Sequence, residues 1–173
     1  MPEKIRYMWG SSSLGDFVVA ASDRGLVAFE FSDDRVSMTK ALQKRFAAAT
    51  IEPDIRGLLM TVRNLQLLID NPDQETDIAI DPRGSVYEKQ VWALLRTIKP
   101  GETASYGSLA EKLGTRDARD VTDAISANAI AILIPCHRVV KKEGSISGYR
   151  WGVRRKRVLL DRERRVVRFR PKE

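Results

Sequence analysis

Hydrophobic residues near the start of the chain gather in three short segments, IRYMWG, DFVVAAS and GLVAFEFS. The polar linkers SSSLG and DRG separate these segments. Short runs of aliphatic and aromatic residues bounded by Ser, Gly and Asp are typical of β-strands joined by turns. The pattern therefore predicts a three-stranded antiparallel meander.

Helical spacing follows the predicted strands. Ser37 is a candidate N-cap for a helix that ends near Ala49, and Asp54 is a candidate N-cap for a second helix that runs to about Asn71, where NPD stops it. One face of the first helix is apolar and is made of Met38, Ala41, Leu42 and Phe46.

From residue 84 onward helical patterns dominate, in SVYEKQVWALLRTI, SYGSLAEKLG and DARDVTDAISAN. This change predicts a domain boundary near Pro82, with an N-terminal α/β support domain at residues 1–82 and a mainly helical C-terminal domain at residues 83–173. The predicted fold class is α+β, because the sheet is confined to the first domain.

Two of the short helices are spaced as in a helix-turn-helix. Ser105 is the candidate N-cap of the first, Gly114 ends it, and TRDA forms the turn. The second helix would bury Val121, Ala124 and Ile125. Its outward face, a candidate DNA-reading surface, carries Arg119, Thr122, Asp123 and Ser126. Ordinary helical hairpins show the same pattern, so the motif alone does not establish DNA binding.

Charge is distributed unevenly along the chain, whose formal net charge is +7. Residues 138–173 contain 14 Lys and Arg and 4 Asp and Glu, a net +10, whereas the preceding 137 residues contain 16 and 19, a net −3. A basic run such as RWGVRRKRVLLDRERRVVRFR is most often a solvated helix face. A segregated positive region also suits a polyanion such as nucleic acid.

Composition limits the location and the cofactors. The chain has no run of eighteen apolar residues and its first residues show no apolar signal segment, so we expect a cytoplasmic protein without membrane insertion. A single cysteine forms no internal disulfide, and one cysteine with one histidine cannot supply four ligands to a structural zinc ion.

The only cysteine and the only histidine, Cys136 and His137, are adjacent in the segment IPCHRVV. The preceding AIAILI predicts a buried strand that ends at Pro135. A lone cysteine is most often a small buried hydrophobe. Here, however, His137 and Arg138 place a base and a cation beside the sulfur, and we expect them to lower the thiol pKa and favour a nucleophilic thiolate.

Glu163 lies within an apolar helical stripe, because its neighbours three and four residues away are Leu159, Leu160, Val166 and Val167. A carboxylate that faces the core needs a polar partner. One of the many nearby arginines is one candidate, and His137 is the other. In the second case Glu163, His137 and Cys136 form a relay in which the carboxylate orients the base.

The segments IPCHRVV, SGYRWGVRRKRVLLDRE and VWALLRTIKPGETASYGSLAEKLG resemble the O6-alkylguanine-DNA alkyltransferase family, most closely the C-terminal domain of its bacterial Ada members. The resemblance covers about the last ninety residues, and the first eighty match only in length and element order. It implies a ribonuclease-H-like N-terminal domain and a C-terminal domain with a helix-turn-helix and an active-site loop.

The resemblance also implies an activity. Such a protein flips O6-alkylguanine, mainly O6-methylguanine, out of double-stranded DNA and transfers the alkyl group irreversibly to a cysteine, once per molecule. No metal or organic cofactor is implied. The expected partner is double-stranded DNA containing the lesion, and we expect a monomer, with cooperative binding along DNA left open.

Matched position by position, Cys136 is the implied alkyl acceptor, with His137 as its base through a bridging water and Glu163 behind it. The implied roles at the lesion and on DNA fall on Tyr106 (proton donor to guanine and contact to the 3′ phosphate), Arg119 (filling the gap in the duplex) and Asn128 (joining the second helix to the active-site segment). DNA contacts are also expected from Thr122, Ser126 and Arg138. The substrate pocket would include the Val139 carbonyl, Tyr149, Arg150 and Trp151.

Some positions depart from the family pattern. Asp120, Thr122 and Asp123 stand where small residues are usual, so we expect weaker DNA affinity. Asp123 lies four residues after Arg119, and we expect the two to pair in the free protein. The bulky Arg150 and Trp151 favour methyl over benzyl groups. The chain lacks the four-cysteine zinc domain of Ada proteins and could be a fragment of, or a partner to, such a protein.

Two other classes remain open. A non-catalytic DNA-binding regulator would need the paired helices but not the thiol. A cysteine hydrolase or redox protein would use Cys136, but a hydrolase histidine usually comes from a distant segment and a redox cycle normally needs a second cysteine.

Overall fold

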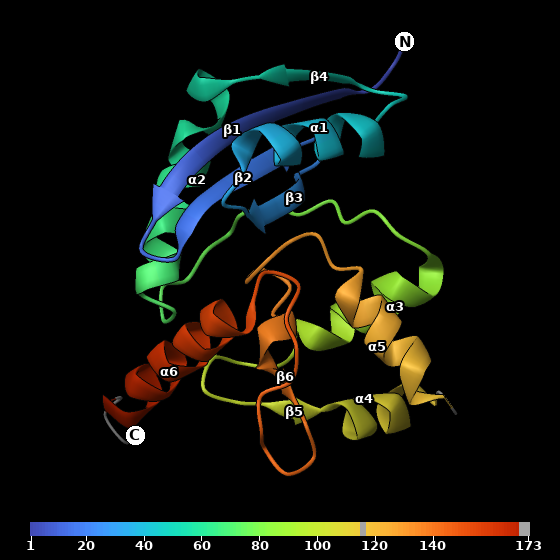
Figure 1. Ribbon diagram of the computed structural model, residues 1–173, viewed down its shortest axis with the longest axis vertical. Helices are drawn as coiled ribbons and strands as arrows, with labels where there is room; N and C mark the ends of the chain where they lie inside the picture. The colour runs from blue at the N-terminus through green and yellow to red at the C-terminus, as the bar shows by residue number, and fades with distance from the viewer. Residues whose placement is uncertain (115–116, 170–173) are drawn as a thin grey trace. The chain divides into compact units, whose positions relative to one another are not determined.

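Three strands of the N-terminal sheet lie where the sequence predicts them. β1 (Lys4–Ser12), β2 (Gly15–Ala21) and β3 (Leu26–Phe31) form an antiparallel meander, as Figure 1 shows in blue. This computed structural model describes residues 1–114 and 117–169. Two units can be distinguished, Met1–Asp70 with Gln74–Pro82, and Asn71–Asp73 with Arg83–Glu173.

A fourth strand, β4 (Thr50–Pro53), pairs in parallel with β1 and gives the sheet the order β3-β2-β1-β4. This strand was not predicted, because TIEP is short and ends in proline, a residue rarely found inside a strand. The sheet is therefore mixed and four-stranded rather than a three-stranded meander alone.

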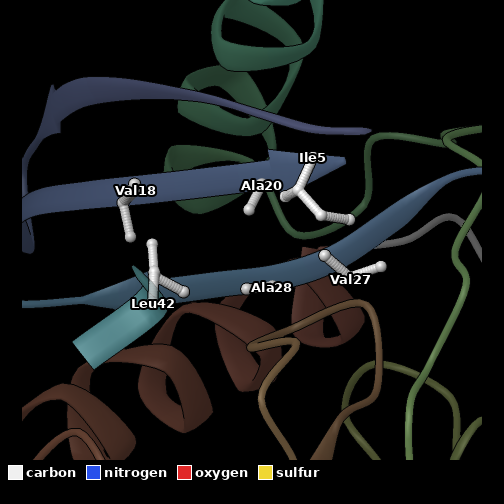
Figure 2. Packing of buried hydrophobic residues seen from close by; sticks show 6 residues of the cluster. All are labelled: Ile5, Val18, Ala20, Val27, Ala28 and Leu42. Carbon is white, nitrogen blue, oxygen red and sulfur yellow. The ribbon is translucent and has the colours of Figure 1, made fainter. Parts of the chain in front are cut away.

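Helices α1 (Arg35–Arg45) and α2 (Ile55–Asp70) cover opposite faces of this sheet. Leu42 of α1 packs in one cluster with residues of the three antiparallel strands, shown in Figure 2: Ile5, Val18, Ala20, Val27 and Ala28. Side chains of successive strand residues point to opposite faces. Phe17 accordingly faces α2, and a Cβ added at Gly10 would come within 2.8 Å of Phe17 and within 2.7 Å of Val62 of α2.

The predicted start of α1 is wrong by three residues. Asp34 is the N-cap, and its carboxylate accepts a hydrogen bond from the backbone N–H of Ser37 at 3.1 Å. Ser37 donates its hydroxyl to the same carboxylate. The helix also ends at Arg45 rather than near Ala49. Asp54, in contrast, caps α2 as predicted by accepting from the N–H of Gly57 at 2.9 Å.

The second unit is mainly helical. Its helices are α3 (Val86–Leu95), α4 (Tyr106–Leu113), α5 (Ala118–Ser126) and α6 (Val153–Phe169). A 3-10 turn, η1 (Cys136–Arg138), leads into β6 (Val139–Val140), which pairs in parallel with β5 (Ala104–Ser105). None of the helices in the described ranges combines the length and apolar content needed to cross a bilayer.

Helices α4 and α5 form the predicted helix-turn-helix. Ser105 caps α4, and Gly114 ends it in a left-handed conformation with φ 70°. Val121, Ala124 and Ile125 of α5 are buried as predicted. Within the predicted turn, residues 115–116 lie outside the described residues. The indole of Trp92 in α3 donates to the Ala124 carbonyl at 2.8 Å and joins α3 to α5.

The predicted strand before Pro135 is wrong. The segment AIAILI is buried but forms turns, and Ile132 has a φ of 66°, an unusual value for a β-branched residue. Asn128 holds these turns together because its side chain accepts from the N–H of Ile130 at 2.9 Å and donates to the carbonyl of Ile134 at 3.0 Å. Apolar content alone cannot distinguish such a turn from a strand.

Candidate active site

A pocket of about 540 Å³ opens in the second unit and reaches the sulfur-bearing residue Cys136. Six of the residues predicted for the site line it: Tyr106, Thr122, Ser126, Cys136, Tyr149 and Arg150. Ile125, Lys141, Ser147 and Gly148 complete the lining. The pocket thus combines the end of α5, the start of α4 and the loop before α6.

The short sheet β5-β6 explains how Tyr106 comes near Cys136, thirty positions away in sequence. β6 begins directly after η1, and it pairs with β5 through Ala104 opposite Val139. Tyr106 follows β5 as the first residue of α4. A two-residue strand leaves no clear sequence signal, so this constraint was not predictable from the hydrophobic pattern.

The thiol of Cys136 is buried, with 5% of the residue exposed. The side-chain amide of Asn128 donates to Sγ at 3.3 Å. Burial outweighs this hydrogen bond and the positive charge of Lys156, and it raises the thiol pKa from 9.0 to about 11. The expected lowering of the thiol pKa is therefore wrong for the free protein, whose Cys136 is protonated at neutral pH.

His137 and Glu163 form the predicted pair, with 2.6 Å between Nε2 and Oε1, and both are buried. Burial alone would raise the pKa of Glu163, but the hydrogen bonds from His137 and Arg138 and the charge of Arg138 lower it to about 2. Burial lowers the pKa of His137 and favours the neutral imidazole. The ionised carboxylate therefore accepts from Nε2–H, and Nδ1 is the basic nitrogen.

Arg138 also binds Glu163, so both partners considered for this carboxylate are present. Its guanidinium donates to Oε1 and Oε2 of Glu163 at 2.9 to 3.1 Å and to the Ile98 carbonyl at 2.6 Å. The predicted contact of Arg138 with DNA stays a prediction, and it would require the buried side chain to give up these bonds. The charge of Arg138 keeps Glu163 ionised.

Sequence reasoning missed Lys156 and Ser147. The Lys156 ammonium is buried and donates to the Val139 carbonyl at 2.6 Å and to the Ser147 hydroxyl at 2.9 Å. Ser147 is in turn 2.6 Å from the Tyr106 hydroxyl. Burial lowers the pKa of Lys156 to about 8. Lys156 lies on the same helical stripe as Glu163, seven residues earlier, and this position was an available signal.

Lys156 also affects the predicted role of Val139. The carbonyl oxygen of Val139 already accepts the short Lys156 bond, and the residue is not among those that line the pocket. A carbonyl oxygen has two lone pairs, so one acceptor position remains for a substrate amino group.

The pocket loop is braced by its own aromatic residues. Tyr149 and Trp151 make an edge-to-face contact with ring centroids 5.2 Å apart. Trp151 is buried and does not line the pocket, so it supports Tyr149 rather than forming a wall itself. The guanidinium of Arg150 lies over the Trp151 ring and donates to the carbonyl of Asn128 at 3.2 Å, which joins the loop to the end of α5.

Arg119 is exposed at the start of α5, where 87% of its side chain is accessible. Its partner is Asp117, at 3.1 Å, and not Asp123 as expected from helical spacing. Asp117 is also the N-cap of α5, so its carboxylate is already directed toward the first turn. The side chains of Thr122, Asp123 and Ser126 are exposed as predicted.

Comparison with known proteins identifies the family. Residues 86–165 match the family model described as 6-O-methylguanine DNA methyltransferase, DNA binding domain. The crystal structure of Mycobacterium tuberculosis O6-methylguanine methyltransferase is 31% identical, covers 98% of this chain and 96% of its own, and has a TM-score of 0.78. The chain belongs to the O6-methylguanine-DNA methyltransferase family.

Two further relatives define the scope of the similarity. The bifunctional transcriptional activator/DNA repair enzyme Ada of Escherichia coli is 42% identical over 160 residues, which are 92% of this chain and 45% of that protein. This chain thus matches less than half of that curated relative. The Mycobacterium tuberculosis OGT structure in complex with DNA is 31% identical, with a TM-score of 0.75, and covers 94% of this chain and 93% of its own.

Glu163→Gln should lower the free energy of unfolding by about 3 kcal/mol, because it leaves the Arg138 guanidinium buried without its counter-charge. The folded pKa of Glu163 is near 2 and its ordinary value is 4.5, so the native protein loses this contribution as pH falls from about 4.5 toward 2. Urea unfolding measures both effects. Asp161→Asn is the control, and equal effects of the two substitutions would contradict the assignment.

The rate of Cys136 alkylation by iodoacetamide in the free protein should rise about tenfold per pH unit from pH 7 to 10, because the thiolate fraction follows a pKa of about 11. Intact-mass kinetics measure this rate, with free cysteine as the reference thiol. A plateau above pH 8 would show a low thiol pKa and refute the effect of burial.

Proposed function

We propose that this protein repairs double-stranded DNA by direct reversal, transferring the methyl group of O6-methylguanine to Cys136 in a single irreversible step. The observation that carries the proposal is the single cysteine of the chain at a pocket whose lining includes Thr122 and Ser126 of α5, the helix expected to contact DNA. A cytoplasmic location is part of the proposal.

The two predicted domains would have different roles. Residues 83–173 would carry DNA binding and chemistry, and residues 1–82 would support them. The helix α5 would enter the minor groove, with Arg119 filling the space left by the flipped base. The related Mycobacterium tuberculosis OGT was solved in complex with DNA, which supports DNA as the partner.

The chemistry requires the thiol proton to leave as the sulfur attacks. At pH 7, ionising a thiol of pKa about 11 costs about 5 kcal/mol, since each pKa unit corresponds to about 1.4 kcal/mol. The neutral His137, oriented by Glu163, would accept this proton through a bridging water at Nδ1. Positioning of the lesion in the pocket would supply the remaining rate acceleration.

The transfer forms a bond between Sγ and the methyl carbon while the bond between that carbon and O6 breaks. The electron pair of the broken bond goes to the guanine, and Tyr106 would donate a proton to the ring. Lys156 and Ser147 would hold the Tyr106 hydroxyl in place. The sequence contains no second cysteine to remove the methyl group, so one molecule would repair one lesion.

A DNA-binding regulator without chemistry is the second candidate. The exposed arginine on α5 suits that function equally well, and such a protein would not need the thiol. The two functions predict different effects of Cys136→Ala: the substitution would abolish repair but would leave the DNA binding of a regulator intact.

Mixing the protein with a short duplex that contains O6-methylguanine should add 14 Da, one methyl group in place of hydrogen, on roughly one site per molecule, with the group mapped to Cys136. Intact mass spectrometry and peptide mapping make the measurement. A duplex with O6-benzylguanine should react more slowly, because the bulky Arg150 lines the pocket. Binding without a mass change, or a mass change that persists in Cys136→Ala, would reject repair through this residue.

Asp117→Asn should tighten binding to duplex DNA up to about fivefold at low salt, because exposed ion pairs are worth at most about 1 kcal/mol. Asparagine keeps the helix cap while releasing Arg119. Asp123→Asn removes the same charge without disrupting the Arg119 pair and serves as the matched control in fluorescence anisotropy titrations. Equal tightening by both variants would indicate general charge repulsion instead.

A further inference from the structure

Helix α6 exposes a row of arginines that the proposed repair reaction does not use. We define the α6 arginine row as Arg154, Arg157, Arg164 and Arg165, all exposed. At 100° per residue these four positions fall within about 100° of the helix circumference, and they span about 16.5 Å along its axis. They therefore form one continuous basic surface.

The opposite face of α6 anchors the row. Lys156, Leu159, Leu160 and Glu163 are buried, and Glu163 binds His137 and Arg138 of η1. The row is consequently carried on a fixed helix and not on a mobile tail. Such preorganisation lowers the entropic cost of binding for long side chains.

Within the described chain, the charge of the row is only slightly neutralised. Asp161 is its one acidic neighbour on that face and lies 3.4 Å from Arg164, in an exposed pair that contributes little. No ion pair to described residues involves Arg154, Arg157 or Arg165. The row thus keeps most of its positive charge for a partner.

We propose that the α6 arginine row binds the phosphates of a second DNA segment while α5 holds the first. Arginine matches phosphate oxygens through two parallel donors. In Figure 1, α6 lies on the other side of η1 and β6 from α4 and α5. The row is on the face of α6 opposite Glu163, whose side chain binds η1, so it is on the far side of the helix from η1. The inference rests on the proposed binding of DNA by α5, and it gives the protein the ability to bridge two duplexes.

DNA is favoured over an anionic membrane because the apolar border of the row, among the residues whose burial is described, is limited to two valines: Val153 is 40% exposed and Val158 is half-buried. A membrane-surface helix places large hydrophobic residues beside its cations. The hydrophobic face of α6 is instead packed in the unit through Leu159 and Leu160. Phosphates at regular spacing match a row of fixed cations along a helix.

The full-length protein is mixed with unmodified duplexes that carry either a donor or an acceptor dye, and energy transfer reports bridging. Bridging should weaken with salt with a slope of about −3 to −4 in a log–log plot, about 0.9 per phosphate contact. Arg154→Ala with Arg157→Ala should halve the slope, and alanine at all four positions should abolish bridging. Lysine at all four positions should retain it.

The matched control removes the same charge elsewhere, with alanine at the exposed residues Lys40, Lys44, Arg56 and Arg63 of α1 and α2. Bridging that survives the row variants, or is lost equally in the control, would overturn the inference. Binding of the same variants to an acidic peptide and to anionic vesicles is also measured. Row variants that lose either of these interactions but still bridge DNA would overturn the inference and indicate another partner.

Methyl transfer from a 12-base-pair lesion duplex separates this inference from the proposed function. If the row variants lose bridging but retain methyl transfer, the α6 arginine row is supported as a second DNA-binding surface. Absence of transfer in the unmodified protein, together with row-dependent bridging, would reject repair and leave the DNA-binding surface supported. Thermal unfolding identifies any variant that fails to fold, and the double substitution then provides the decisive comparison.

Discussion

The buried carboxylate of Glu163 is the constraint on which the second unit depends. It holds both the neutral imidazole of His137 and the guanidinium of Arg138, and Arg138 continues to the Ile98 carbonyl. One charge thus joins α6, η1 and the segment after α3. The cation keeps the carboxylate ionised, and the ionised carboxylate fixes the tautomer of the histidine. Structural and chemical roles therefore belong to the same three side chains.

This arrangement explains how the thiol of Cys136 can be protected from oxidation and still be suited to the proposed methyl transfer. Arg138, two residues after Cys136 in the sequence, is directed to Glu163, so burial dominates at the sulfur and the thiol pKa rises to about 11. A protonated, buried thiol resists oxidation and non-specific alkylation. In the proposed reaction, activation would come from proton transfer to an oriented base when the lesion fills the pocket, so specificity and reactivity would depend on the same event.

The sequence predicted those features that depend on periodicity or on an unusual residue in an apolar stripe. These include the first three strands, the helix-turn-helix, and Glu163 beside His137. Features set by tertiary context were missed: β4 and β5 are too short for a pattern, and the turn at Ile132 depends on the side chain of Asn128. The partner of Arg119 was also mistaken, because a capping carboxylate two residues earlier competes with helical i,i+4 spacing.

Helix α6 shows how one amphipathic segment can serve several requirements. Its buried stripe carries Lys156 and Glu163 among leucines, and each has a short hydrogen bond, so neither is left without a polar partner. Replacing either with an apolar residue would disconnect the pocket loop or η1 from the helix. Since the stripe fixes the helix rotation, the arginines on the opposite face are held in a defined direction. The internal hydrogen bonds that orient the proposed base therefore also determine which surface of the unit carries its positive charge.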